Sequence, residues 1–125
     1  MYFTDYCILS DDVVKVAKFY TELFQVSTEL NNIHTSIQGP NVAITVYNID
    51  KAREEGYDFN EAGSGKTYIG FNVDNVNKEY IRVKALGAKI LSPPVTWPWG
   101  ATSFRFCDPD GNMIVFRSWN GEFDE

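Results

Sequence analysis

Histidine and cysteine are scarce in this sequence: among 125 residues there is one histidine, His34, and there are two cysteines, Cys7 and Cys107. Two cysteines form no disulfide framework of the kind found in small secreted domains, so we expect free thiols and a cytoplasmic protein. No apolar run approaches the roughly 20 residues that a membrane-spanning helix needs. The first residues lack the basic and apolar regions of a signal peptide. We therefore expect neither a membrane anchor nor export.

Basic residues are also few, because 11 lysines and arginines stand against 17 acidic residues, which gives a net charge of -6. This balance argues against a nucleic-acid partner, whose phosphates require a basic surface. It is compatible with a cationic ligand, although an acidic surface more often serves solubility. Hydrophobic residues make up 44% of the chain and charged residues 22%, as in globular proteins. We expect a single domain over residues 1–125.

The first half of the chain alternates between strand-like and helix-like patterns. Period-two alternation predicts strands at residues 2–10, 26–30, 33–38 and 42–47. Apolar residues at helical spacing, preceded by Asp11 or Asp12 as N-cap, predict an amphipathic helix over residues 12–24. Residues 48–66 are polar and glycine-containing, with only a weak helical pattern at 51–55. This segment is predicted to be a linker or a lid.

The second half repeats the same order of patterns. A strand at 67–73, a helix from 74 or 75 to 86 that ends at Gly87, and a strand at 88–91 are followed by a proline-rich loop at 92–100. Residues 101–118 then form a predicted hairpin around the turn Asp108–Gly111. Alternation gives this hairpin one apolar face with Phe104, Phe106, Ile114 and Phe116. Its other face carries Ser103, Arg105, Cys107, Met113, Val115 and Arg117, which suggests a lined cleft.

The repeated pattern predicts the fold class. Each half reads βαβββ, so the chain is predicted to be an α+β protein with modules at about 1–50 and 66–120, joined by a linker at 51–65. The open sheet face of one such module needs a cover. Two modules side by side would form a curved, cleft-enclosing mixed sheet.

Several short motifs that occur in order along the chain indicate a family. They are Asp12-Val13, Phe19-Tyr20, Phe71–Asp74, Ala85–Ala88, Pro93-Pro94, Trp99-Gly100 and Asp108–Asn112. With these motifs the chain resembles the vicinal oxygen chelate superfamily, which includes glyoxalase I, bleomycin resistance proteins and extradiol dioxygenases. The resemblance implies paired βαβββ modules, and it implies a homodimer because relatives commonly dimerise.

The resemblance also implies where metal ligands would stand. In the metal enzymes of this family, ligands occupy positions that correspond here to Asp5, Tyr68 and Val115, with one further place among residues 43, 45 and 47. Of these only Asp5 could bind a metal ion, whereas a catalytic divalent site uses three protein ligands and an open position. The lone His34 supplies no second set. We therefore expect no metal, no other cofactor and no catalytic residue of the usual family type.

The predicted ligand-binding residues line the two sheet faces that turn away from the helices. They are Asp5, Cys7, Thr45, Tyr68, Trp97, Trp99, Ser103, Arg105, Val115 and Arg117. Several have a structural alternative. Asp5 could bond to nearby backbone or to an arginine, and Arg105 could pair with Asp5 or Glu29. The tryptophans could fasten their loop or form a dimer surface. Both cysteine thiols are expected to be buried and inert.

Three functions remain open from the sequence. The first is a metal-free small-molecule binding protein of the bleomycin-resistance type, with an aromatic or cationic ligand in a cleft between the modules. The second is a glyoxalase-like lyase or isomerase, or a dioxygenase-related enzyme, with an atypical or absent metal site. The third is a non-catalytic structural or regulatory dimer. The fold alone does not choose among them.

Overall fold

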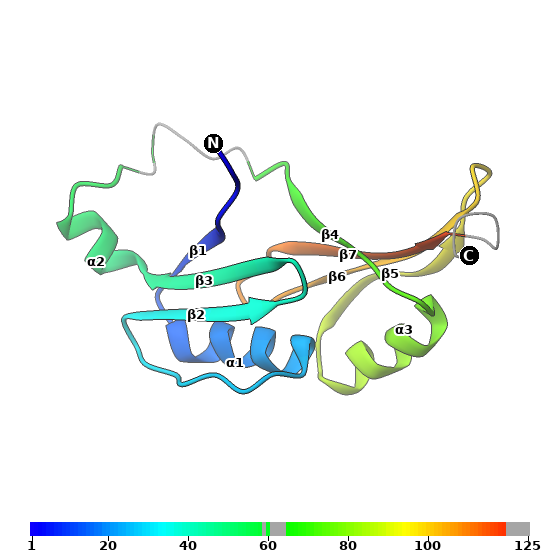
Figure 1. Cartoon of the computed structure of the whole chain (residues 1–125), viewed down its shortest axis with the longest axis horizontal. Helices are drawn as coiled ribbons and strands as arrows, with labels where there is room; N and C mark the ends of the chain where they lie inside the picture. The colour runs from blue at the N-terminus through cyan, green and yellow to red at the C-terminus, as the bar shows by residue number, and fades with distance from the viewer. Residues whose placement is uncertain (59, 61–64, 120–125) are drawn as a thin grey trace. The chain divides into compact units, whose positions relative to one another are not determined.

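The computed structural model describes residues 1–58, 60 and 65–119 (Figure 1). The chain divides into two compact units, Met1–Ser64 and Gly65–Glu125, and each has its own sheet. Among the described residues, no helix has the length and apolar character to cross a membrane. The predicted α+β class with mixed strand pairing is confirmed, and each unit has a mixed sheet of its own.

The first unit is a three-stranded sheet covered by one long helix. Its elements in order are β1 (Tyr6–Ser10), α1 (Val13–Phe24), β2 (His34–Gly39), β3 (Val42–Asn48) and α2 (Ile49–Glu54). The sheet order is β1-β3-β2, with β1 parallel and β2 antiparallel to β3. The Asp12 side chain accepts from the backbone N–H of Lys15 and so starts α1 as predicted. The apolar stripe of α1 packs on Ile37, Ile44 and Val46, which are all fully buried.

The predicted strand at residues 26–30 is absent, so this prediction is wrong. Most of its side chains are exposed, and Val26 instead closes α1 by donating its N–H to the carbonyl of Thr21. Farther along, the Asn31 side chain accepts from the N–H groups of Ile33 and His34. Because Asn side chains that satisfy local backbone groups favour turns, this segment becomes a connection between α1 and β2.

The predicted linker contains a short helix. The Asn48 side chain accepts from the N–H groups of Asp50 and Lys51, which fixes the start of α2. Ala52 is fully buried, and Arg53 pairs with Asp50 one turn back. The weak helical pattern at residues 51–55 therefore corresponds to helix α2. The helix begins earlier than the pattern, at residue 49, because Asn48 caps it.

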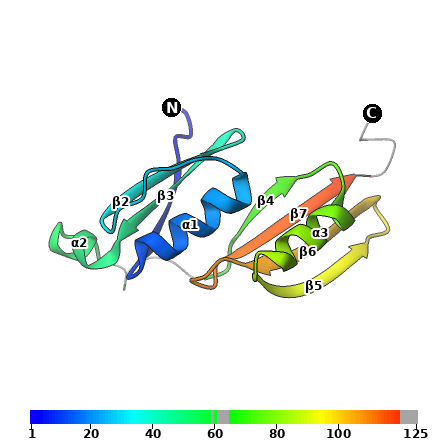
Figure 2. The same cartoon turned by 90° about the horizontal axis from the view of Figure 1, so that it is seen from below.

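The second unit has the predicted βαβββ order. Its elements are β4 (Tyr68–Asn72), α3 (Val76–Ala85), β5 (Lys89–Thr96), β6 (Ala101–Cys107) and β7 (Met113–Trp119), with strand order β4-β7-β6-β5. Helix α3 lies against one face of this sheet (Figure 2). The predicted apolar hairpin face is buried under it: Phe104 meets Tyr80 of α3 edge to face, and Phe106, Ile114 and Phe116 complete the cluster.

Strand β5 runs farther than predicted, through Pro93 and Pro94 to Thr96, where the sequence indicated a loop. Proline cannot donate to a sheet, and it is tolerated here because β5 is an edge strand with β6 as its one partner. Register shifts between Ile90 and Val95 absorb the two prolines. As a result the loop shrinks to residues 97–100, and Trp97 follows directly after the end of the sheet.

Candidate functional site

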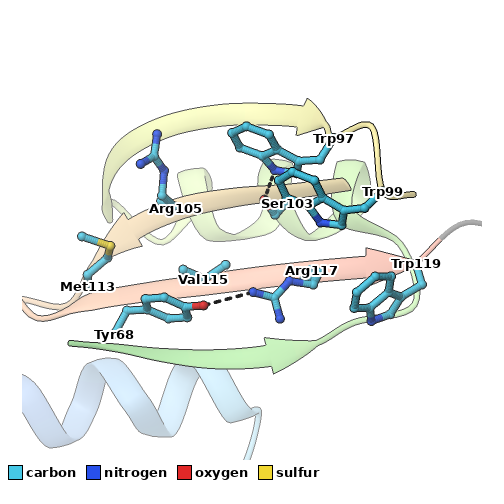
Figure 3. A pocket seen from close by; sticks show the side chains of 9 residues that line it. All are labelled: Tyr68, Trp97, Trp99, Ser103, Arg105, Met113, Val115, Arg117 and Trp119. Carbon is cyan, nitrogen blue, oxygen red and sulfur yellow. Dashed lines mark hydrogen bonds between the residues drawn. The ribbon is translucent and has the colours of Figure 1, made fainter. Parts of the chain in front are cut away.

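The second unit has a pocket of about 500 Å³ on the sheet face opposite α3 (Figure 3). Alternation along β6 and β7 places large apolar side chains under the helix and the intervening residues in this pocket. Strand β4 and the loop between β5 and β6 add the remaining walls. The pocket is lined by Tyr68, Trp97, Trp99, Ser103, Arg105, Met113, Val115, Arg117 and Trp119. Its volume is within the range of small-molecule sites.

An aromatic wall is built by the loop between β5 and β6. The Trp97 and Trp99 rings stack with their centroids 5.2 Å apart and an angle of 8° between their planes. The Trp97 indole N–H donates to the Ser103 hydroxyl at 2.9 Å, and Ser103 is buried on β6. At 5.2 Å the pair leaves no room for a third ring between them. A planar ligand would therefore stack on the outer face of the pair.

The loop itself is held by the backbone. Trp97 donates its N–H to the carbonyl of Ala101, and Gly100 donates to the carbonyl of Trp97. Gly100 has a φ of 101°, which only glycine adopts without strain. Just outside the loop, the hydroxyls of Thr96 and Thr102 lie 3.0 Å apart. These contacts hold the aromatic wall in place before any ligand arrives.

Two arginines supply the formal charges of the pocket. Arg105 on β6 is paired with Val115 on β7, and Arg117 on β7 is paired with Ser103, so the two arginines are diagonal neighbours on one face. Arg117 Nη2 donates to the Tyr68 hydroxyl at 3.3 Å (Figure 3). Among the described residues of this unit, no carboxylate forms an ion pair with either arginine. The charged groups that line the pocket are therefore both positive.

The floor of the pocket contains Val115, at one of the positions where the resemblance implies a metal ligand. Val115 is buried at the centre of this floor and offers no donor atom, and the Tyr68 hydroxyl accepts from Arg117. Within the described part of the chain, no three His, Cys, Asp or Glu side chains gather closely enough to hold a metal ion. The residues present do not fit the metal that the resemblance implies.

Seven of the ten predicted site residues line this one pocket: Tyr68, Trp97, Trp99, Ser103, Arg105, Val115 and Arg117. The list of predicted site residues left out two lining residues, Met113 and Trp119. Alternation had already placed Met113 on this face of the hairpin, and Trp119 is the next residue on the same face of β7 after Arg117. Their binding role, like that of the other seven, stays a prediction.

The other three predicted residues, Asp5, Cys7 and Thr45, form a cluster in the first unit. Cys7 is paired with Thr45 between β1 and β3. The pKa of Asp5 lies below its usual value because the hydroxyls of Thr4 and Thr45 donate to its carboxylate, with a smaller contribution from His34. Asp5 is therefore bonded to neighbouring hydroxyls, whereas its structural alternative was a bond to nearby backbone or to an arginine. Whether this cluster and the pocket serve one ligand stays a prediction.

The two cysteines differ from each other. Cys107 is buried as expected, but the prediction that Cys7 is buried is wrong, because it lies on the sheet face opposite α1 and is exposed. Partial desolvation of the sulfur and the nearby Asp5 carboxylate both raise the pKa of the Cys7 thiol. Cys7 is accordingly a poor nucleophile despite its exposure. His34 is an exposed residue of β2, and its ring contacts the ring of Tyr47.

These observations define an α+β protein of two similar units with an aromatic, positively charged pocket in the second. The family model described as Glyoxalase/Bleomycin resistance protein/Dioxygenase superfamily matches residues 3–116. The chain belongs to this superfamily, which confirms the resemblance inferred from its motifs.

Solved structures of similar proteins agree with the fold. A glyoxalase/bleomycin resistance protein/dioxygenase from Nocardioides is 23% identical, with a TM-score of 0.79 over 97% of this chain and 85% of that one. A family enzyme from Burkholderia phytofirmans PsJN is 19% identical, with a TM-score of 0.80 over 93% of this chain and 97% of that one.

A lactoylglutathione lyase from Agrobacterium tumefaciens is 18% identical, with a TM-score of 0.71 over 94% of this chain and 92% of that one. No match to the chain was found among curated protein sequences. Because these identities are low, the likeness concerns the fold, and the activities named for those proteins are not thereby those of this chain.

Proposed function

We propose that this protein binds a small molecule with an aromatic group in the pocket of the second unit, without a metal ion, as bleomycin resistance proteins of the family do. The observation that carries the proposal is the gathering of all three tryptophans of the chain, with two arginines, around one pocket of about 500 Å³. Binding sites are usually apolar and aromatic with a few oriented polar groups, and this lining has that composition.

The rigidity of the wall supports binding rather than a structural role for the tryptophans. Trp99 is 62% exposed and Trp97 is 37% exposed, so neither ring is used mainly to fill the core. Their loop is already fixed by backbone hydrogen bonds and by Ser103. A ligand that stacks on a wall already in position loses less free energy to ordering of the site.

The proposal is tested by titration of aromatic compounds, including aromatic and glycopeptide antibiotics, while tryptophan fluorescence and the melting temperature are followed. Because every tryptophan of the chain lines the pocket, a change in emission reports on this site. A ligand at a hundred times its Kd stabilises the folded state by about 2.7 kcal/mol and raises the melting temperature.

Two variants test whether the ligand binds at the tryptophans of the pocket. Trp99→Ala should weaken it about tenfold, since stacking of a base on an aromatic side chain contributes about 1–3 kcal/mol. Ile81→Ala is the matched control, because Ile81 is 70% exposed on α3, across the sheet from the pocket. The proposal is wrong if no aromatic compound binds while a thioester or a 2-oxoacid does, which would favour a glyoxalase-like enzyme.

The metal-free part of the proposal needs its own measurement. Protein purified without chelator is analysed for nickel, zinc and iron. We expect less than stoichiometric amounts, because Val115 and Tyr68 occupy positions where the resemblance implies metal-binding side chains. A stoichiometric metal that is lost in Asp5→Ala would overturn this part. We include a homodimer in the proposal, as the resemblance implies, and light scattering measures the molar mass in solution.

A further inference from the structure

The charge of the pocket is opposite to the charge of the chain. The chain has a net charge of -6, yet the charged side chains that line the pocket are Arg105 and Arg117. The expectation of a cationic ligand came from the acidic balance of the whole chain, which the lining of this pocket does not share. A cation in the pocket of the second unit would face two like charges at close range. An anion there would meet two opposite charges beside a wall of low polarity.

The two arginines stand close together on one face of the sheet, although their guanidinium groups point to different sides: Arg117 toward Tyr68 and Arg105 toward β5 (Figure 3). Diagonal neighbours on one face of an antiparallel pair are about 7–8 Å apart, and Val115 lies between Arg105 and Arg117 in the pocket floor (Figure 3). The Tyr68 hydroxyl takes one N–H of Arg117 and fixes that side chain. A guanidinium has five N–H donors, so most of those on Arg117 remain available to a ligand.

From this arrangement we propose that the ligand is a planar aromatic carboxylate. Its rings would stack on the outer face of the Trp97–Trp99 pair and its carboxylate would bind Arg117. The exposed Arg105 side chain would turn from β5 to meet the same carboxylate. A carboxylate is planar and matches the donor fork of arginine with two parallel hydrogen bonds. The volume of about 500 Å³ accommodates two or three fused rings. This inference rests on the proposed function, because it names the ligand class of the same pocket.

The test compares three probes of nearly equal shape on the full chain by isothermal titration calorimetry. They are 2-naphthoate, its neutral analogue 2-naphthamide and the cation 2-naphthylmethylammonium. Charge-assisted hydrogen bonds contribute about 1.5–3 kcal/mol, so 2-naphthoate should bind at least about tenfold more tightly than 2-naphthamide. The cation should bind most weakly of the three.

Arginine variants connect that preference to the pocket. Arg117→Gln and Arg105→Gln should each weaken binding of 2-naphthoate at least about fivefold and leave 2-naphthamide within about twofold, because only the carboxylate loses a charged partner. Lys89→Gln removes one positive charge from an exposed position on β5 outside the pocket lining, so it controls for net charge. It should leave both affinities within about twofold.

Any other outcome overturns either this inference alone or the proposed function together with it. Equal binding of 2-naphthoate and 2-naphthamide, or the same loss in Lys89→Gln as in the arginine variants, overturns the inference while the proposed function stands. The same holds if 2-naphthoate fails to bind but other aromatic compounds bind at the tryptophans. If no aromatic compound binds there, the proposed function and this inference are both wrong.

Discussion

The indole N–H of Trp97 donates a hydrogen bond of 2.9 Å to the hydroxyl of Ser103, and this bond fastens the aromatic loop to strand β6. Ser103 is buried, and its hydroxyl accepts the hydrogen bond that orients the Trp97 ring. Trp99 in turn stacks on Trp97. The orientation of both rings therefore depends on one buried hydroxyl.

Ser103→Ala should loosen this wall. The indole N–H loses its acceptor, which costs about 1 kcal/mol of stability, and ligand affinity should fall several-fold as the ring pair becomes mobile. Urea unfolding, tryptophan emission and the Kd of an aromatic ligand measure these effects. Thr102→Ala is the control on the same strand, because it removes only the exposed contact with Thr96. An unchanged emission spectrum in Ser103→Ala would contradict the prediction.

The turn between β6 and β7 depends on Asp108. Its carboxylate accepts from the backbone N–H groups of Asp110 and Asn112 and from the side-chain amide of Asn112, and it is buried. Asp108→Ala leaves these donors without that partner and should cost about 2–3 kcal/mol of stability. Asp108→Asn keeps one acceptor oxygen and should cost clearly less. Chemical denaturation measures the stability of both variants. An equal loss in the two would contradict the role of the Asp108 oxygens as hydrogen-bond acceptors in the turn.

The core of the second unit is centred on Phe104. Its ring is fully buried and contacts the rings of Tyr80, Phe106 and Phe116. Phe104→Ala should destabilise the fold by about 3–5 kcal/mol, from lost burial and the cavity that remains. Ile81→Ala on the exposed side of α3 should change the stability by less than about 0.5 kcal/mol. Comparable losses in the two variants would contradict the described core.

The reactivity of Cys7 should depend on Asp5. Burial raises the pKa of the thiol, and the Asp5 carboxylate raises it further because a thiolate beside a carboxylate is disfavoured. In a Cys107→Ser background, alkylation of Cys7 by iodoacetamide should be slower at pH 8.5 than alkylation of a free cysteine. Asp5→Asn removes the carboxylate charge and should speed the reaction, with the rate profile moved toward lower pH. A profile that Asp5→Asn leaves in place would contradict this.

The stability of the protein should also respond to Asp5 at acid pH. Its pKa in the folded state lies below the usual 3.8 because Thr4 and Thr45 donate to the carboxylate. The stabilisation is present above the usual pKa and is lost as the pH falls through the lower folded value. The stability difference between the parent and Asp5→Asn should therefore shrink from about pH 5 to pH 3. Urea unfolding across this range measures it, and Thr45→Val should reduce the effect.

Much of the fold could be predicted because its signals are local. The apolar stripe of α1, its Asp12 cap and the alternation of β6 and β7 around the Asp108 turn depend on residues close together in the chain. Errors arose where local patterns were weak. Residues 26–30 alternate, but they have no sheet to join, and Pro93 and Pro94 suggested a loop in a place where an edge strand tolerates them.

The sequence by itself determined which residues face away from the helices, because the period of a strand decides this, and seven of its ten predicted site residues line one pocket. Only the tertiary structure decided which of them meet. Arg117 bonds Tyr68 although they are 49 positions apart, because the parallel pairing of β4 with β7 brings them to one face. The same folding places Ser103 under Trp97, and in the first unit it brings Asp5, Cys7 and Thr45 together. Such contacts depend on strand order and register, which no local pattern in the chain specifies.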